Sequence, residues 1–363
     1  MSIEIIGLLV VLILVLVLPF CFKKVEHNLE IFLFVMGILS VIISGVLNLQ
    51  LLEEIAKDIN LYIITGAVLI AGFLFKFTKK KINNFISYVQ NKLPEPVLIF
   101  LIVVVLGFIS SVITAIIAAL ILVEIVQGLH ITHKAKIRLT IITCFSIGLG
   151  AILTPAGEPI AVVVTSNMKQ SFWYLFSLLN FWIIFGVLAF GIFGGIYISK
   201  ISKVAKDATI SLDGEKVIKD LDVVDIVEET NKDILIRAGK VFLFVIALIL
   251  LGNGFKLMID KYVAGLNNVF LYWANIISAI LDNATLASAE ISKTMDPFKV
   301  KAILLGLLIS GGMLIPGNIP NIISAGKLKI KSKEWAKFGI PVGLVTLTIY
   351  CILLFVFKLG QIK

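Results

Sequence analysis

The sequence predicts an all-α polytopic membrane protein made of inverted repeats, each with a re-entrant helical hairpin and a broken transmembrane helix. Three observations predict this fold: the composition, the lengths of the apolar runs, and two pairs of matching segments. The 363 residues are 59% hydrophobic and 15% charged, with a mean hydropathy of +1.07. Soluble domains carry about a quarter of their residues charged, so much of this chain must face lipid.

Plain membrane spans account for most of the apolar runs. A helix needs about 20 apolar residues to cross a hydrocarbon core of about 30 Å. Residues 1–60 hold two such spans, which we assign to an N-terminal scaffold. The plain spans are expected at 3–22, 31–48, 61–77, 172–198, 238–255 and 336–357.

Four further segments do not fit a plain span. The apolar runs 96–127 and 263–292 are too long for one crossing, since 30 helical residues would measure about 45 Å. We expect them to be hairpins that enter and leave on the same side. The segments 138–168 and 300–326 are interrupted by Thr-Pro-Ala-Gly-Glu-Pro (154–159) and Pro-Gly-Asn-Ile-Pro-Asn (316–321). Prolines at this spacing end a regular helix, so both segments are predicted to be broken spans.

These four segments form two matching pairs, which indicates an internal repeat. Gly-Ala-Ile-Leu-Thr-Pro-Ala-Gly-Glu-Pro (150–159) aligns without gaps on Gly-Gly-Met-Leu-Ile-Pro-Gly-Asn-Ile-Pro (311–320), at an offset of 161. Ile-Ser-Ser-Val-Ile-Thr-Ala (109–115) aligns on Ile-Ser-Ala-Ile-Leu-Asp-Asn (277–283), at an offset of 168. We therefore expect a first repeat at 61–199 and a second, inverted repeat at 236–363.

The net charge of +9 serves as a topology label and does not indicate nucleic-acid binding. If the two long runs are hairpins, 23 of the 32 lysines and arginines lie in cytoplasmic links. If both runs cross the bilayer, only 15 of the 32 do. The positive-inside rule favours the hairpins. We expect a multi-pass protein of the cell membrane, with a cytoplasmic linker at 200–235 and both termini on the extracytoplasmic side.

Two carboxylates are predicted at mid-depth, where an acid is costly and usually functional. Glu158 lies in the first break and Asp282 at the tip of the second hairpin. We expect both to bind a cation or a proton, and Asn283 to join them as a Na⁺ ligand. Neutral oxygen ligands for the substrate or ion are supplied by Ser110, Ser111, Thr114, Thr154, Gly157, Asn283, Thr285, Asn318 and Asn321. Taken singly, a membrane Ser or Thr more often bonds its own helical turn.

Glu124 and Glu290 lie near the ends of hairpin arms, and the sequence leaves open whether they are functional or interfacial. Nucleophile triads, phosphate-binding glycine loops and metal-ligand clusters do not occur in the sequence. We therefore expect no enzyme activity and no cofactor, with Na⁺ and H⁺ as the transported or coupling ions.

The two breaks and the two hairpin tips resemble those of the ion transporter superfamily, which includes sodium/proton antiporters, arsenite permeases and sodium–dicarboxylate carriers. The likeness is carried by Ser-Ser-Val-Ile-Thr-Ala (110–115), Thr-Pro-Ala-Gly-Glu-Pro (154–159), Asp-Asn-Ala-Thr (282–285) and Gly-Asn-Ile-Pro-Asn (317–321). The chain looks closest to an uncharacterised predicted cation transporter family, domain of unknown function 1646. The resemblance implies a scaffold and a transport domain, an elevator motion and often a homodimer.

Discontinuous helices in inverted repeats are typical of secondary transporters, which hold their substrate where the breaks meet. The sequence therefore predicts a secondary active transporter in the lipid bilayer, a Na⁺/H⁺ antiporter in which Glu158 and Asp282 titrate. In the related dicarboxylate carriers each hairpin tip binds sodium and substrate through a Ser-Asn-Thr motif. The extra acid at 282 argues against a dianion as substrate. Two alternatives remain open: a Na⁺-coupled symporter of a small organic anion such as a carboxylate, and a membrane scaffold that does not transport.

Overall fold

The computed structural model describes most of the chain as helix. The described residues are 3–22, 24–25, 28–59, 61–63, 65–66, 68–70, 72–73, 76–77, 92–129, 131–210, 230–281 and 283–357. Every regular element within these ranges is helical and none is a strand, so the predicted all-α class is confirmed for this part of the protein. Asp282 and most of the predicted linker lie outside the described residues.

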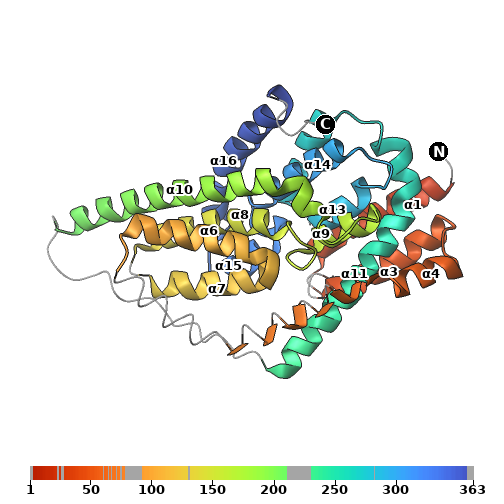
Figure 1. The fold of residues 1–363 in the computed structure, drawn as a ribbon, viewed down its shortest axis with the longest axis horizontal. Coiled ribbons are helices and arrows are strands. Elements are labelled where there is room, and N and C mark those ends of the chain that lie inside the picture. Colours follow the sequence, from red (N-terminus) through yellow and green to blue (C-terminus); the bar gives the residue numbers. More distant parts are fainter. Residues whose placement is uncertain are drawn as a thin grey trace.

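The N-terminal helices and one later helix form a layer that we call the panel. It contains α1 (Ile3–Cys21), α3 (Leu29–Ile43), α4 (Leu49–Ala56), α11 (Asn231–Met258) and the helical residues described between 61 and 77. Helix α3 packs along α11 and against α1 (Figure 1). Gly37 permits this close approach, because a Cβ there would lie 2.9 Å from the Ala247 carbonyl oxygen.

The predicted span at 31–48 ends earlier than expected. Helix α3 stops at Ile43 because Gly45 takes a left-handed backbone with φ of +70°. The amide of Val46 then bonds back to the carbonyl of Val41. A short amphipathic helix, α4, follows the turn, with Leu51 and Ile55 on its buried face.

The predicted hairpin at 96–127 consists of two packed helices, α6 (Glu95–Ile113) and α7 (Ala115–Gly128). They are separated at Thr114, whose φ of +77° is rare for a β-branched residue and breaks the helix. The Thr114 hydroxyl then caps α7 by accepting from the Ile117 amide at 3.3 Å. We call this unit hairpin one.

The segment 138–168, predicted as the first broken span, corresponds to two helices and the turn between them. Helix α8 (His133–Ala151) ends before a turn at 152–158, called break one, and α9 (Pro159–Asn167) begins directly after it. Pro159 at the first helical position of α9 needs no amide partner, so it starts the helix without penalty. Helix α10 (Tyr174–Ile210) then packs along α6 and α8, and it runs well beyond the predicted span 172–198.

The second half repeats this order of elements. A π-turn η1 (Ile259–Val263) ends α11, and hairpin two follows as α12 (Asn268–Ala274), the 3₁₀-helix η2 (Asn275–Ala279) and α13 (Asn283–Glu290). Helix α14 (Pro297–Gly311) leads into break two at 312–318, which contains the 3₁₀-turn η3 (Ile315–Gly317). The chain closes with α15 (Ile319–Lys327), α16 (Ser332–Cys351) and the π-turn η4 (Ile352–Val356).

The short helix of each half packs against the hairpin of the other half. Helix α9 of break one packs against α13 of hairpin two, while α15 of break two packs against α7 of hairpin one. In Figure 1, α9 and α13 lie between the panel and the bundle formed by α6, α7, α8, α10 and α15. The short helix that follows each break therefore packs against the hairpin of the other half.

Within the described residues, four helices are long and apolar enough to cross a membrane: Glu95–Ile113, Tyr174–Ser202, Asn231–Val263 and Ser332–Val356. The last three contain or overlap the predicted spans 172–198, 238–255 and 336–357. The first, by contrast, is α6, which was predicted as one arm of a hairpin. Shorter apolar helices occur at Ile3–Pro19, Glu30–Ile43 and Leu61–Ile70, where the remaining plain spans were predicted.

Candidate functional site

Glu158 lies where break one meets the start of α9. It is the residue before the first turn of α9, with extended backbone at φ −150° and ψ 145°, and its side chain does not cap the helix. The carboxyl group is instead directed into the protein interior, and the residue is only 2% exposed. Pro155 and Pro159 on either side keep this stretch out of a continuous helix.

The side chain facing Glu158 comes from the other half of the chain. Asn283, at the first turn of α13, directs its amide Nδ2 to Glu158 Oε1 at 3.4 Å. Asn283 is 3% exposed and neighbours Thr285, which is 2% exposed. The structure thus brings together two predicted site residues that are 125 positions apart in the sequence. Asp282, the second predicted acid, lies outside the described residues.

A small cavity of about 40 Å³ opens beside Glu158. Hairpin one contributes Thr114, break one contributes Gly157 and Glu158, and α15 contributes Ile319. The opposite wall belongs to the panel: Val68, Val241, Phe244 and Val245. Its lining is mostly apolar, and the space has room for only a few water-sized groups, because a single water needs about 10–15 Å³. We refer to it as the Glu158 cavity.

Gly157 is required for break one to fold against hairpin one. A Cβ at this position would lie 2.1 Å from the Ala151 carbonyl oxygen and 2.9 Å from the Ser111 Cα. The carbonyl oxygen of Gly157 accepts from the Ala115 amide at 2.8 Å, which joins the break to the first turn of α7. Its predicted role as a ligand is thus accompanied by a clear structural role.

The hydroxyl groups that the sequence grouped around the acids bond mainly to backbone. Ser110 Oγ donates to the Gly107 carbonyl at 2.7 Å and contacts the Ile147 carbonyl at 3.1 Å. Ser111 Oγ donates to the Phe108 carbonyl at 2.7 Å. Thr154 Oγ1 donates to the Ser111 carbonyl. These three side chains tie α6, α8 and break one together, as membrane hydroxyls commonly do.

Break two holds amides where break one holds an acid. Asn318 is 3% exposed and packs on α8, where Gly148 leaves room: a Cβ there would lie 2.6 Å from Asn318 Nδ2. Asn321 is fully buried and donates through Nδ2 to the carbonyls of Gly311 and Leu314, both at 2.8 Å. Within the described ranges, three buried oxygens here have no hydrogen-bond partner: Asn318 Oδ1, Asn321 Oδ1 and Ser310 Oγ. Such oxygens are free to accept from a proton donor or to bind a cation.

The two breaks have matching backbone geometry at an offset of 160 residues. Glu158 and Asn318 both precede a nine-residue helix, with φ and ψ of −150° and 145° in one and −152° and 146° in the other. Both helices are followed by a left-handed lysine two residues past their last residue, Lys169 with φ of +50° after α9 and Lys329 with φ of +52° after α15. Glu158 therefore corresponds to Asn318, whereas the gap-free sequence alignment paired it with Ile319.

The contacts between hairpin and broken span match as well. Ser110 Oγ lies 3.1 Å from the Ile147 carbonyl oxygen in the first half. Ser278 Oγ lies 3.1 Å from the Leu307 carbonyl oxygen in the second half. The two serines are a pair in the sequence alignment, and the two carbonyls are again 160 residues apart.

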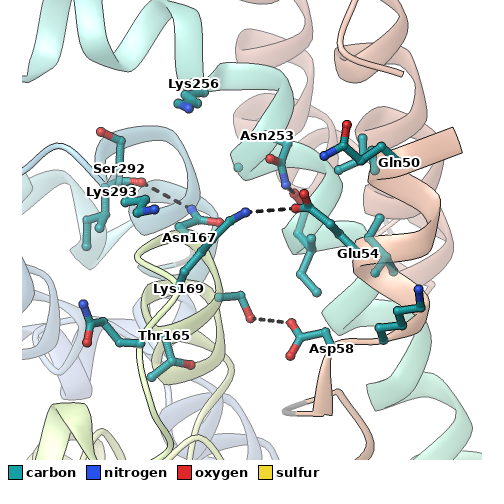
Figure 2. Close-up of a pocket in the computed structure, with 18 of the residues that line it drawn as sticks. Gln50, Glu54, Asp58, Thr165, Asn167, Lys169, Asn253, Lys256, Ser292 and Lys293 are labelled. Carbon is teal, nitrogen blue, oxygen red and sulfur yellow. Dashed lines mark hydrogen bonds and ion pairs between the residues drawn. The ribbon is translucent and has the colours of Figure 1, made fainter. Parts of the chain in front are cut away.

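A second, larger cavity of about 700 Å³ lies between α4, the C-terminal end of α9 and the end of α11. We call it the α4–α9 cavity. Figure 2 shows Lys169 reaching from the end of α9 to Glu54 on α4, with their charged atoms 3.0 Å apart. Ser166 Oγ and Asp58 Oδ2 lie 3.4 Å apart in the same cavity. Sequence reasoning missed this site, because its members come from four separate parts of the chain, 50–59, 165–170, 249–256 and 291–293.

Sequence reasoning also missed Asn275, a fully buried amide on η2. Its Nδ2 donates to Glu290 Oε2 at 2.9 Å. The sequence left the role of Glu290 open. The one feature that could have indicated the pair is the amide of Asn275, 15 residues earlier in an apolar stretch. Within the described ranges, groups of three or more His, Cys, Asp and Glu residues that could hold a metal ion do not occur.

Fold and site together define the class: an all-helical protein with helices built to cross a membrane, whose broken helices and hairpins meet around a buried carboxyl group. The family model described as "Protein of unknown function (DUF1646)" matches residues 5–357. The chain belongs to this family. Among curated proteins, nothing matches it.

Proposed function

We propose that the protein is a secondary active transporter, a Na⁺/H⁺ antiporter of the cell membrane that works by elevator-type alternating access. The observation that carries the proposal is the meeting of Glu158 from break one with Asn283 from hairpin two, 3.4 Å apart and almost fully buried. A buried carboxyl group at the junction of broken helices is typical of an ion or proton pathway.

Two inverted repeats form the proposed transport unit. Support comes from the common backbone of the breaks at an offset of 160 residues and from the equivalent serine contacts of the hairpins. Support also comes from the exchange of α9 and α15 between the halves. Each hairpin is then re-entrant, with its tip near the middle of the bilayer.

The proposed topology places both hairpins as re-entrant, and side-chain contacts support it. Crossing hairpins would put Arg138 and Phe338 on opposite sides of the membrane, yet Arg138 Cζ lies 5.3 Å from the Phe338 ring. They would also separate Lys76 from Asn231, whose side chains lie 2.8 Å apart. Lys169 and Glu54 would be separated in the same way. With re-entrant hairpins each of these pairs lies on one side.

In this proposal the substrate is a small hard cation. Glu158 supplies the charged ligand, and a rotated Asn283 amide would supply a neutral oxygen. Asn318, Asn321 and Asp282 complete the proposed set. Carboxylate and amide oxygens are the ligands that such cations prefer. When the cation leaves, a proton on Glu158 neutralises the buried charge, because a lone carboxylate is costly at this depth.

The elevator motion is proposed from the walls of the Glu158 cavity. One wall consists of hairpin and break residues, and the other consists of apolar panel residues such as Val68 and Phe244. An apolar wall offers few polar contacts to break when the bundle slides along it. The bound site can thus move past the panel, which we propose to be the fixed scaffold of a homodimer.

The alternative, a Na⁺-coupled symporter of a small organic anion, rests on a different feature of the same site. The N-terminal ends of α7, α9, α13 and α15 come from the hairpin tips and the breaks, and helix N-termini attract anions. Glu158 directly precedes α9, however, so its own negative charge already occupies one of these ends.

The test is Na⁺-driven proton movement in proteoliposomes without any organic solute. We expect wild-type protein to move protons when Na⁺ is added, and Glu158→Gln and Asp282→Asn to lose this activity. Glu334→Gln is the matched control, because Glu334 is an exposed acid that caps the start of α16. Proton movement that is unchanged in both variants would disprove the site. Movement that requires an organic anion would favour the symporter instead.

The topology has a separate test, single cysteines in a background without Cys21, Cys144 and Cys351. Lys134 is exposed at the start of α8 and is predicted to be cytoplasmic. Lys57 is exposed after α4 and is predicted to be extracytoplasmic. We expect a membrane-impermeant maleimide to label Lys57→Cys from outside and Lys134→Cys only after the membrane is opened. External labelling at both positions would rule out a re-entrant hairpin one.

A further inference from the structure

The two arms of hairpin two are joined by a polar contact that the proposed mechanism does not use. Asn275 on η2 is fully buried, and its Nδ2 lies 2.9 Å from Glu290 Oε2 at the end of α13. Glu290 is partly buried, and Asn275 is its one hydrogen-bonding or ionic partner in the part of the chain that the structure describes. The contact joins η2 to the end of α13 within hairpin two.

The amide oxygen of Asn275, Oδ1, bears on the protonation state of Glu290. Oδ1 is buried and has no hydrogen-bond partner among the residues that the structure describes. Leaving a buried acceptor without a partner costs about 1–3 kcal/mol. Nδ2 and Oδ1 belong to one planar amide group, so a carboxyl group that accepts from Nδ2 can also reach Oδ1. An ionised Glu290 offers only acceptors to this oxygen, so it cannot satisfy it.

A neutral, protonated Glu290 would give Asn275 Oδ1 the hydrogen-bond donor that it lacks. A carboxylic acid and a primary amide can form two parallel hydrogen bonds, in which the amide donates to the acid carbonyl and the acid hydroxyl donates to the amide oxygen. The first of these bonds is present at 2.9 Å. The second requires a proton on Glu290, and it supplies the partner that Asn275 Oδ1 lacks.

Charged groups on the elements packed against α13 do not supply the missing partner. Towards this end of hairpin two these groups are Glu4, Lys169, Lys256, Asp260, Lys261, Asp296, Lys299 and Lys301. Several have contacts of their own: Asp260 Oδ1 accepts from Ser292 and Thr294, Lys169 pairs with Glu54, and Lys299 donates to the carbonyls of Ala264 and Leu266. Lys301 lies within electrostatic range of Asp296.

A route for protons to this carboxyl group is adjacent. Ile291, Ser292 and Lys293 follow Glu290 directly and line the α4–α9 cavity. Figure 2 shows Ser292 and Lys293 at the edge of that cavity, opposite Asn167. The cavity is large enough to hold water, at about 700 Å³. Glu290 therefore lies one residue from a cavity with room for water, while Glu158 lines the separate, small cavity.

We propose that Glu290, paired with Asn275, is a proton-binding site of hairpin two that is distinct from the Glu158 site. In the neutral state the Glu290 hydroxyl donates to Asn275 Oδ1. On ionisation the proton leaves to water in the α4–α9 cavity and this hydrogen bond is lost. The role of this proton in exchange against Na⁺ rests on the proposed function, whereas its presence on Glu290 does not.

The first experiment detects the proton directly, whether or not the protein transports Na⁺. Infrared difference spectra are recorded on wild-type protein, Glu290→Gln, Asn275→Ser and the control Glu334→Gln. We expect a protonated-carboxyl band at neutral pH that is absent in Glu290→Gln, shifted in Asn275→Ser and unchanged in the control. Glu290→Gln should fold normally, because its amide can form the same two hydrogen bonds with Asn275.

Two results would overturn the proposal. Identical bands in wild-type protein and Glu290→Gln at neutral pH would mean that Glu290 is ionised. A band that disappears when Na⁺ is added, and does so equally in Glu158→Gln, would make the pair a sodium site instead. Either result leaves the Glu158 proposal untouched.

The second experiment separates the two acids by flux. In proteoliposomes, Glu290→Gln should exchange radioactive Na⁺ for Na⁺ at the wild-type rate but lose at least tenfold in Na⁺-driven proton movement. Glu158→Gln should lose both activities. If Glu290→Gln keeps full proton movement, the site does not contribute protons to exchange. If wild-type protein moves no Na⁺ at all, the proposed function fails while the infrared result still decides the proton site.

Discussion

Break one and break two share a backbone and differ in the side chain at their central position. Both lead into a nine-residue helix through an extended residue, and a left-handed lysine follows two residues after each helix ends. At the shared position break one has Glu158, which faces Asn283, and break two has Asn318, which faces α8 at Gly148. The repeated backbone therefore positions two polar groups alike, while the ionisable group occurs in only one of these two breaks.

The first and largest expected difference lies in transport. Glu158→Gln should lower Na⁺-driven proton movement about 100-fold, because one charge-assisted contact contributes up to about 3 kcal/mol. Asn318→Ala should lower it only about tenfold, since a neutral ligand contributes less. The initial rate of proton movement in proteoliposomes measures both. Equal losses in the two variants would mean that the breaks are functionally equivalent.

The glycines of the breaks test whether the shared backbone is equally tight in both halves. A Cβ at Gly157 would lie 2.1 Å from a carbonyl oxygen, and a Cβ at Gly317 would lie 2.6 Å from two of them. We expect Gly157→Ala and Gly317→Ala each to destabilise the protein by about 1–3 kcal/mol, with the larger loss at Gly157. Thermal unfolding in detergent measures this, with Gly326→Ala as the control because a Cβ there meets open space. A variant at either position that is as stable as the control would contradict the packing.

The equivalent serines should behave alike if the halves are structural copies. Ser110→Ala and Ser278→Ala each remove one hydroxyl that lies 3.1 Å from a carbonyl of the neighbouring broken span. We expect each to reduce the free energy of unfolding by about 0.5–1.5 kcal/mol. The same unfolding measurement applies. A loss confined to one serine would show that the halves are held together differently.

The smallest expected difference concerns the two left-handed lysines. Glycine takes this backbone without strain, so Lys329→Gly should stabilise the protein by up to about 1 kcal/mol. Lys169→Gly should gain less, because it also removes the contact between Lys169 Nζ and Glu54 Oε2 at 3.0 Å. Denaturation curves of the two variants measured side by side decide this. A larger gain at position 169 would mean that its ion pair does not stabilise the fold.

The hairpins and breaks could be located from sequence because their signals are local. Prolines 155 and 159 end α8 and begin α9, and Thr114 falls within the matched stretch 109–115. The sequence alignment of the two breaks differs by one residue from the match of their backbones. The matched prolines set an offset of 161, whereas the helix caps show 160.

Contacts between distant segments limited the prediction of the site. Nothing local in the sequence indicates that Asn283 faces Glu158, since 125 residues separate them. The clustering of Ser110, Ser111 and Thr154 was predicted from the sequence, but their bonds to backbone carbonyls were not, because hydroxyls serve equally well as ligands and as helix ties. Asn275 and Glu290 became a pair only when the hairpin brought its two arms together.

Helix α10 is longer than a membrane crossing requires. Its 37 residues measure about 55 Å, nearly twice the hydrocarbon thickness of a bilayer. If one end of α10 lies at the membrane interface, about 25 Å of the helix extends beyond a hydrocarbon core of about 30 Å. Helix α10 would then serve as a spacer as well as a span.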